Sequence, residues 1–137
     1  MSDGQESGAV RVESLSVILT RAARALAADL DAVLKPHGLA TDHWLVLESL
    51  TRESGLTMTA LVDRTGTNGA TLTRVVDRLV SNALAYREVD AVDRRKVRVY
   101  ASTRGRALHR KLAAVVEERE RALVDAGLIS PQAMSLL

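Results

Sequence analysis

The spacing of apolar residues constrains the fold of this chain most strongly. Over most of the sequence, leucine, valine and alanine recur at steps of three and four residues, which is the period of an amphipathic helix. The period then changes to two, where Val97, Val99 and Ala101 alternate with Arg98 and Tyr100. This pattern predicts a mainly α protein with a small β-hairpin, an α+β arrangement.

Caps and breakers predict where the first helices begin and end. A first helix is expected from Ser14, a suitable N-cap, to Lys35-Pro36-His37-Gly38, because proline disfavours helix in the preceding residue. A second helix begins near Thr41, and a short third helix follows Leu56-Thr57. Thr65-Gly66-Thr67 then forms a tight break.

Two longer helices lie on either side of the hairpin in the sequence. Asn68 is a good N-cap for the fourth helix, and the fifth begins near Ser102 and ends at Gly127. The fourth helix carries an apolar stripe of Leu72, Val75, Val76, Leu79 and Val80. The fifth is expected to bury Leu108, Leu112, Val115, Ala122 and Leu123. Ser130-Pro131 predicts a short last helix.

Composition excludes several classes of protein. The chain has 137 residues, the size of one domain, and its lack of cysteine excludes disulfides and thiolate metal sites. No apolar run is long enough to span a bilayer, and the start lacks the order of charge and hydrophobicity of a signal peptide. We expect a cytoplasmic protein with a disordered tail over residues 1–10.

Positive charge is concentrated in one segment. Residues 84–111 carry nine basic and three acidic side chains, whereas residues 1–83 carry eight basic and ten acidic ones. A cationic segment of this kind attracts polyanions. Charge alone leaves a solvated surface stretch as an equal alternative.

The short third helix, the break and the fourth helix together predict a helix-turn-helix. A helix that enters the major groove must offer hydrogen-bond donors, and Arg74 and Arg78 can reach guanine edges or phosphates. The residues expected on DNA are Asn68, Ala70, Thr71, Thr73, Arg74 and Arg78. By itself, this helix could also be an ordinary amphipathic surface helix.

The hairpin predicts a wing, a β-ribbon with a charged tip beside the helix-turn-helix. The tip carries Arg94, Arg95 and Lys96, and arginine suits the negative potential of the minor groove. Asp93 is placed to hold an arginine in a fixed orientation through a bidentate pair. The alternative is a solvated charged turn.

Residues 56–108 resemble the MarR family of winged-helix regulators (multiple antibiotic resistance regulators). The matching stretches are the run from Ala70 to Leu79 and Asp93-Arg94-Arg95, and Ser102 with Gly105 is similar to the family's Thr-x-x-Gly motif. The resemblance implies a winged helix-turn-helix in which the helix from Asn68 to Arg78 lies in the major groove.

The resemblance also implies roles for the wing. Arg95 is similar to the family's minor-groove arginine, and Asp93 and Arg94 help to fix the wing. The chain departs from the family at three places: Ala83 replaces a usual glycine, Ala101-Ser102 replaces Leu-Thr, and Thr67 replaces an apolar residue.

The apolar stripes of the terminal helices predict a homodimer, because such surface must be buried. The expected organisation is one winged-helix domain over residues 11–137. Residues 14–37 and 103–137 form dimerisation helices, and residues 41–102 form the DNA-binding lobe. A dimer spaces two recognition helices to match a palindromic operator in double-stranded DNA. A monomer with terminal helices that cap its core is the alternative.

Family members often bind small aromatic or phenolic acids between the dimer helices and the DNA-binding lobe. The resemblance therefore implies a ligand pocket near His43 and Trp44, with core packing as the alternative for Trp44. No cofactor and no metal site are expected. Asp42, His43 and His109 are the candidate ligands for a metal, but position 113 is Ala113 and offers no second histidine on the fifth helix.

These patterns predict a dimeric, sequence-specific transcriptional regulator, a repressor released by a small molecule. The alternative is a DNA-architectural protein of the same fold with little sequence readout. An enzyme is not expected, since the chain has no cysteine, no glycine-rich phosphate loop and only His37, His43 and His109 as histidines.

Overall fold

The computed structural model describes residues 14–127 and 129. The expected tail over residues 1–10 and the expected last helix after Ser130 lie outside the described residues. In chain order, the elements are α2 (Leu15–Leu34), the 3-10 helix η1 (Lys35–His37), α3 (Thr41–Arg52), β1 (Leu56–Thr57), α4 (Met58–Thr65), α5 (Gly69–Ser81), β2 (Ala85–Val89), β3 (Val97–Ala101) and α6 (Thr103–Asp125). The predicted mainly α fold with a small β-hairpin is confirmed.

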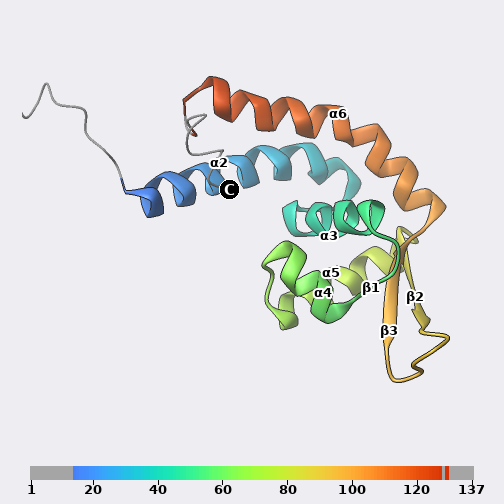
Figure 1. The fold of residues 1–137 in the computed structure, drawn as a ribbon. Coiled ribbons are helices and arrows are strands. Elements are labelled where there is room, and N and C mark those ends of the chain that lie inside the picture. Colours follow the sequence, from blue (N-terminus) through green and yellow to red (C-terminus); the bar gives the residue numbers. More distant parts are fainter. Residues whose placement is uncertain (1–13, 128, 130–137) are drawn as a thin grey trace, which may run out of the picture.

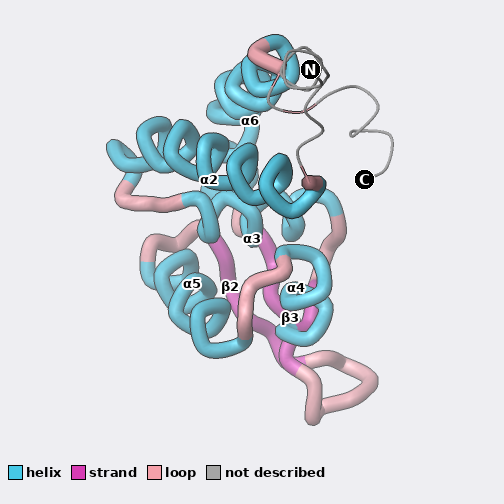
Figure 2. The backbone as a smooth tube through the Cα atoms, turned by 90° about the vertical axis from the view of Figure 1, so that its left-hand side faces the viewer, coloured by secondary structure: helices cyan, strands magenta, loops and turns pink. Residues whose placement is uncertain are grey.

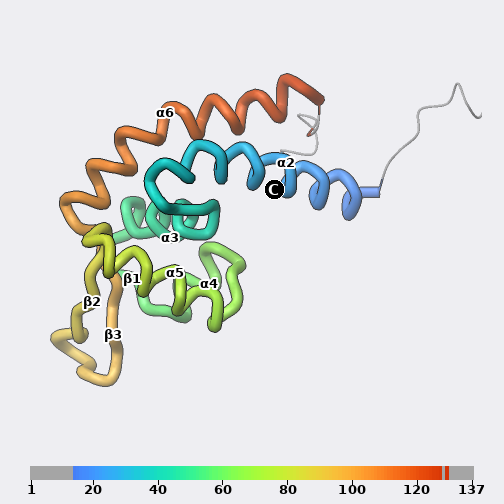
Figure 3. Tube along the Cα trace, turned by 180° about the vertical axis from the view of Figure 1, so that it is seen from behind, coloured from blue at the N-terminus to red at the C-terminus, as the bar shows by residue number. Residues whose placement is uncertain are grey.

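The helices form layers that separate the two long ones from the rest. Helices α2 and α6 run side by side at one end of the molecule, and α3 lies beneath α2 (Figure 1). Helices α4 and α5 lie on the far side of α3, as the view from behind also shows (Figure 3). The hairpin of β2 and β3 projects away from the long helices.

The core is built from leucine and valine around a single tryptophan. Trp44 and Leu47 of α3 lie at its centre, and Trp44 is only 2% exposed. The predicted stripe of α5 is confirmed, since Leu72, Val75, Val76 and Leu79 are all buried and Val80 packs partly against them. Burying this stripe leaves the opposite face of α5 exposed.

The predicted stripe of α6 is wrong in part. Leu112 and Leu123 are buried as expected, but Val116 is buried in place of Val115, which stays 36% exposed. Ala122, also expected in the stripe, is exposed. One residue turns a helix by about 100°, so a two-residue apolar run does not show which member faces the core. Leu15 and Val17 of α2 are also half exposed.

The wing is part of a three-stranded sheet rather than a two-stranded hairpin. Strand β1 pairs with β3 through Leu56 and Val99, and the strand order is β1-β3-β2. The hairpin register runs from Ala85 opposite Ala101 to Val89 opposite Val97. Two residues are too few to show a period of two, which is why the sequence pattern missed β1.

The predicted N-caps Ser14 and Asn68 are present, and Ser102 caps a third helix. The side chain of Ser14 accepts a hydrogen bond from the Val17 amide, and that of Asn68 accepts one from the Thr71 amide at 2.9 Å. Ser102 accepts one from the Gly105 amide at 3.0 Å. Each cap satisfies an amide that the first turn of a helix leaves unpaired, so local sequence defines these helix starts.

Helix α5 ends in a left-handed turn at Ala83. The Leu84 amide donates to the Leu79 carbonyl at 2.8 Å, and the Ala83 amide donates to the Val80 carbonyl at 3.0 Å. This arrangement places Ala83 at a φ of 59°, the only positive φ outside glycine in the described part of the chain. Alanine is strained there, whereas glycine is not.

We expect Ala83→Gly to stabilise the protein by about 0.5 to 1 kcal/mol, because relief of left-handed strain exceeds the entropic cost of glycine. Ala114→Gly, an exposed site in the middle of α6, is the matched control. It should destabilise by about 1 kcal/mol. Denaturant unfolding measures both changes, and a loss of stability in Ala83→Gly would contradict the interpretation.

Candidate DNA-binding surface

The outer face of α5 presents the residues that the sequence predicted on DNA. Ala70, Thr73 and Arg74 are exposed, and the Arg74 guanidinium lies 3.5 Å from the Thr71 hydroxyl. The Thr73 hydroxyl donates to the Gly69 carbonyl within the helix, and the side-chain oxygen of the N-cap Asn68 accepts from the Thr71 amide. Arg74 is thus an exposed cationic side chain in the first half of α5.

Arg78 makes a contact that sequence reasoning missed. Its guanidinium donates to the Gly38 carbonyl at 3.2 Å and so connects α5 to the loop between η1 and α3. Its positive charge, together with the larger effect of burial, lowers the pKa of His43. Arg78 is thus held by a backbone carbonyl 40 residues away, whereas Arg74 contacts the Thr71 hydroxyl of its own helix.

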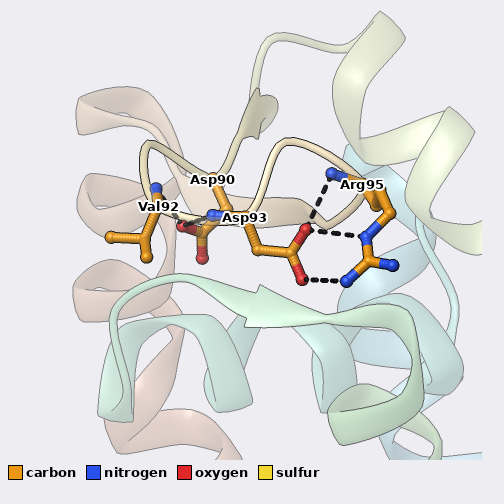
Figure 4. A network of polar contacts seen from close by, with 4 residues as sticks. All are labelled: Asp90, Val92, Asp93 and Arg95. Carbon is orange, nitrogen blue, oxygen red and sulfur yellow. Dashed lines mark hydrogen bonds and ion pairs between the residues drawn. The ribbon is translucent and has the colours of Figure 1, made fainter.

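The wing tip holds one arginine in a defined orientation. Asp93 accepts hydrogen bonds from the Arg95 amide and Nε, both at 3.1 Å, and from Nη2 at 3.4 Å (Figure 4). The pKa of Asp93 is lowered mainly by the Arg95 side chain. The Arg95 side chain is nevertheless 90% exposed. Arg94 and Lys96 are exposed beside it.

A second carboxylate, Asp90, organises the base of the tip. It accepts from Arg98 Nε at 2.7 Å and from the amides of Val92 and Asp93. The same Arg98 donates through Nη1 to the Gly55 carbonyl at 3.0 Å, which ties the wing to the turn before β1. The sequence showed Asp90 only as part of a charged tip, because its partner is eight residues away across the hairpin.

We expect Asp90 to titrate far below an ordinary aspartate. The hydrogen bond from Arg98, followed by those from the two amides, lowers its pKa from 3.8 to about 2. These bonds favour the charged carboxylate, so they support the folded wing above pH 4 and are lost as the pH falls through about 2. Carboxyl NMR measures the titration, and Arg98→Gln should move it back toward 3.8. An Asp90 that titrates normally in the unaltered protein would contradict this network.

The wing and α5 are joined and lie at the same end of the molecule. Arg87 of β2 forms an ion pair with Asp77 of α5. The loop of the wing extends beyond α4 and α5, away from α2 and α6 (Figure 2). A duplex that received α5 would therefore lie beside the wing tip.

The two residues expected to form a ligand pocket, His43 and Trp44, make different contacts. His43 accepts a hydrogen bond from the Ala40 amide through Nδ1 at 3.0 Å and completes the start of α3. Trp44 is buried and stacks on His109 of α6, with ring centroids 4.8 Å apart. In the part of the chain that the structure describes, no group of three or more histidine, cysteine or acidic residues could hold a metal ion.

Hydropathy adds one finding about the helices. In the described ranges, no helix is both long enough and apolar enough to cross a membrane.

A recognition helix beside a β-wing, both at one end of a helical scaffold, defines the winged helix-turn-helix class of proteins. A profile of the MarR family matches residues 37–96. The chain is also 31% identical over 112 residues to the HTH-type transcriptional regulator PetP of Rhodobacter capsulatus, an alignment that covers 82% of this chain and 66% of PetP. The chain belongs to the MarR family of transcriptional regulators.

Solved structures agree with this assignment. BpsR of Bordetella bronchiseptica, described as a protein with DNA binding regulated by 6-hydroxynicotinic acid, is 25% identical with a TM-score of 0.76. The match covers 90% of this chain and 87% of BpsR. MepR of S. aureus, solved as a DNA complex, has a TM-score of 0.76 at 21% identity over 91% of each chain, which supports the fold alone.

Proposed function

We propose that this protein is a homodimeric repressor that binds a palindromic operator in double-stranded DNA and is released by a small aromatic ligand. The observation that carries the proposal is that α5 and the wing each present an exposed arginine. These are Arg74 on α5 and Arg95, which Asp93 holds, on the wing. One cation faces the major groove while the other reaches the adjoining minor groove. This role requires no catalytic step, and it places the protein in the cytoplasm with the DNA.

Exposed apolar side chains support the dimer. Leu15 and Val17 of α2 are each 50% exposed, and Val115 of α6 is 36% exposed. All three lie on the long helices at the end of the molecule opposite the wing (Figure 1). A second copy that packed against these helices would cover them and hold two copies of α5 at a fixed separation.

A binding selection on random duplex DNA, combined with light scattering of the purified protein, tests the proposal. We expect a dimer and a selected palindrome with half-sites about one helical turn apart. Uniform, salt-sensitive binding to all sequences would instead support a DNA-architectural protein. A monomer that ignores duplex DNA at low salt would overturn the proposal.

We expect Arg74→Ala to weaken binding to the operator at least tenfold more than binding to random DNA, because a bidentate contact with a guanine edge is worth about 1–3 kcal/mol. Binding isotherms on both duplexes at matched salt measure the difference. Arg64→Ala on α4, an exposed arginine paired with Glu53, is the matched control. Equal losses on the two duplexes would mean that Arg74 contacts phosphate only.

A pocket beside η1 supports the response to a ligand. It has a volume of about 470 Å³ and lies where η1, the end of α5 and the start of α6 meet. Arg104 and Lys111 supply positive charge, and Leu84 and Leu108 supply apolar surface. These features suit an aromatic acid. The pocket that Trp44 lines is less suitable, because Glu48, Glu117 and Glu120 also line it. A hydroxybenzoate or hydroxynicotinate should lower DNA affinity, and Lys111→Ala should weaken that effect.

A further inference from the structure

A hollow lies between the wing and the start of α4, and we call it the wing hollow. Strand β1 pairs with β3 so that Thr57 lies opposite Arg98, and α4 therefore begins beside the residues that precede Arg98. Helix α4 lies next to β3 in the fold (Figure 2). The wing hollow has a volume of about 550 Å³, and its lining residues are Thr57, Met58 and Thr59 on one side and Arg95, Lys96 and Val97 on the other.

The polar side chains of the wing hollow are accessible. Thr59 and Lys96 are exposed, and the Arg95 side chain is 90% exposed. The Thr57 hydroxyl already accepts a hydrogen bond from the Ala60 amide at 3.2 Å. Among the described residues, the Thr59 hydroxyl and the Lys96 ammonium have neither a hydrogen-bond partner nor an ion-pair partner. These two donors are therefore available to a ligand.

The lining of the wing hollow is positively charged. Arg95 and Lys96 are its charged members, and no carboxylate lines it. Asp93, outside the hollow, forms an ion pair with Arg95, and Arg95 lowers the pKa of this carboxyl more than Lys96 does. Asp93 thus offsets the charge of Arg95, while the charge of Lys96 is left for an anion. An ammonium group beside a hydroxyl suits the oxygens of a phosphate.

The position of the wing hollow identifies the anion. In a duplex, one sugar-phosphate backbone separates each major groove from the adjoining minor groove. The proposed function places α5 in a major groove and Arg95 in the next minor groove. Helix α4 packs against α5, and Arg95 itself lines the hollow. The backbone that separates the two grooves must therefore pass the start of α4, where a phosphate can reach the two free donors.

We propose that the wing hollow binds one phosphate of the DNA backbone in each protomer. Lys96 and Thr59 donate to the phosphate oxygens, and Met58 and the 43% exposed Val97 face the neighbouring sugar. This inference rests on the proposed function and adds α4 to the elements that contact the duplex. A phosphate contact carries no sequence information, so its role is to fix the position of α5 and the wing along the backbone.

Duplexes with a methylphosphonate at one backbone position test this site, because the substitution removes the charge of one phosphate. The selected duplex is substituted at each position of both half-sites in turn, and fluorescence anisotropy measures the affinity. Between the grooves contacted by α5 and Arg95, we expect one position at which the substitution weakens binding about tenfold. In Lys96→Met, the same substitution should weaken binding less than twofold, because its partner charge is already absent.

Lys35→Met is the matched control for Lys96→Met. Lys35 is an exposed lysine of η1 that does not line the wing hollow. Its loss removes the same charge, so the methylphosphonate at the identified position should still weaken binding about tenfold. A methylphosphonate effect that is the same in Lys96→Met and Lys35→Met at every position would overturn the proposal.

The hydroxyl of Thr59 is tested separately. Thr59→Val should weaken binding of the unmodified duplex about fivefold, whereas Thr59→Ser keeps the hydroxyl and should stay within about twofold of the unaltered protein. Thr103→Val is the matched control, since Thr103 is exposed in the first turn of α6 and lies outside the hollow. Circular dichroism checks that all three variants melt alike. A Thr59→Val protein that binds as tightly as Thr103→Val would contradict the role of Thr59.

The outcomes separate this site from the proposed function. A protein that selects a palindrome but has no backbone position coupled to Lys96 would keep the repressor proposal and lose the phosphate site. A protein that binds all duplexes equally would lose the repressor proposal. The phosphate site would then be supported by a slope of log affinity against log salt that is about two lower in Lys96→Met than in Lys35→Met. A protein that binds no duplex at low salt would lose both.

Discussion

Replacing Arg95 by alanine is expected to weaken binding to every DNA duplex about a hundredfold. Asp93 holds Arg95 Nε at 3.1 Å, so in the proposed complex the side chain would enter the groove with little loss of conformational freedom. Loss of one such cation costs about 1.4 kcal/mol, a factor of ten, and a dimer loses two. The slope of log affinity against log salt should fall by about two.

The control for this prediction is Arg121→Ala. Arg121 is exposed near the end of α6, far from the wing, and its loss changes net charge by the same amount. Affinity should stay within about twofold of the unaltered protein, since separated surface charges are screened by salt. Asp93→Asn should fall between the two, because Arg95 keeps its charge but loses its carboxylate partner. Unchanged affinity in Arg95→Ala would remove the wing from the mechanism.

Gly105→Ala is expected to lower the free energy of unfolding by about 3 kcal/mol and the melting temperature by roughly 10 °C. A Cβ at Gly105 would lie 2.0 Å from the Leu84 carbonyl oxygen and 3.2 Å from Leu47 Cδ1. The nearer atom belongs to the backbone, and the Ser102 amide already donates to it at 3.0 Å. The start of α6 would have to move away from the end of α5 to make room.

Gly69→Ala is the matched control for this substitution. Gly69 also lies in the first turn of a helix, but a Cβ there would meet nothing within 4 Å. Its effect on stability should stay within about 0.5 kcal/mol. Thermal unfolding followed by circular dichroism compares the two variants. Similar melting temperatures for both would mean that the contact between Gly105 and Leu84 relaxes at no cost.

The two substitutions separate folding from function. Gly105→Ala acts where the start of α6 meets Leu84, between α5 and β2, whereas Arg95→Ala acts at an exposed tip that contributes nothing to the core. A Gly105→Ala protein that remains folded at low temperature should bind DNA with its wing and α5 intact. Measuring both properties in both variants therefore distinguishes loss of the fold from loss of the DNA contact.

The pocket beside η1 and the pocket that Trp44 lines differ in the charge of the side chains that line them. The resemblance to the MarR family implied an aromatic acid near Trp44, yet the space beside Trp44 contains Glu48, Glu117 and Glu120. The cationic side chains Arg104 and Lys111 line a different pocket. The lining of each pocket comes from more than one element, so its chemistry follows from how those elements pack.

Local sequence determined the helices, their caps, the hairpin and the cationic wing of this protein. Asn68 caps a helix through an amide three residues away, and Asp93 binds an arginine two residues away. Such contacts depend on residues that the chain itself holds close together, so the order of residue types is enough to predict them. The buried stripe of α5 followed from the same local periodicity.

Only the tertiary structure decided which distant groups meet. Arg78 donates to Gly38 across 40 residues, and Arg98 donates to Gly55 across 43 residues. Gly105 must remain small because the Leu84 carbonyl lies against it, and Val116 rather than Val115 faces the core. These contacts are set by the angles and distances at which helices pack, and those depend on all side chains of the core together.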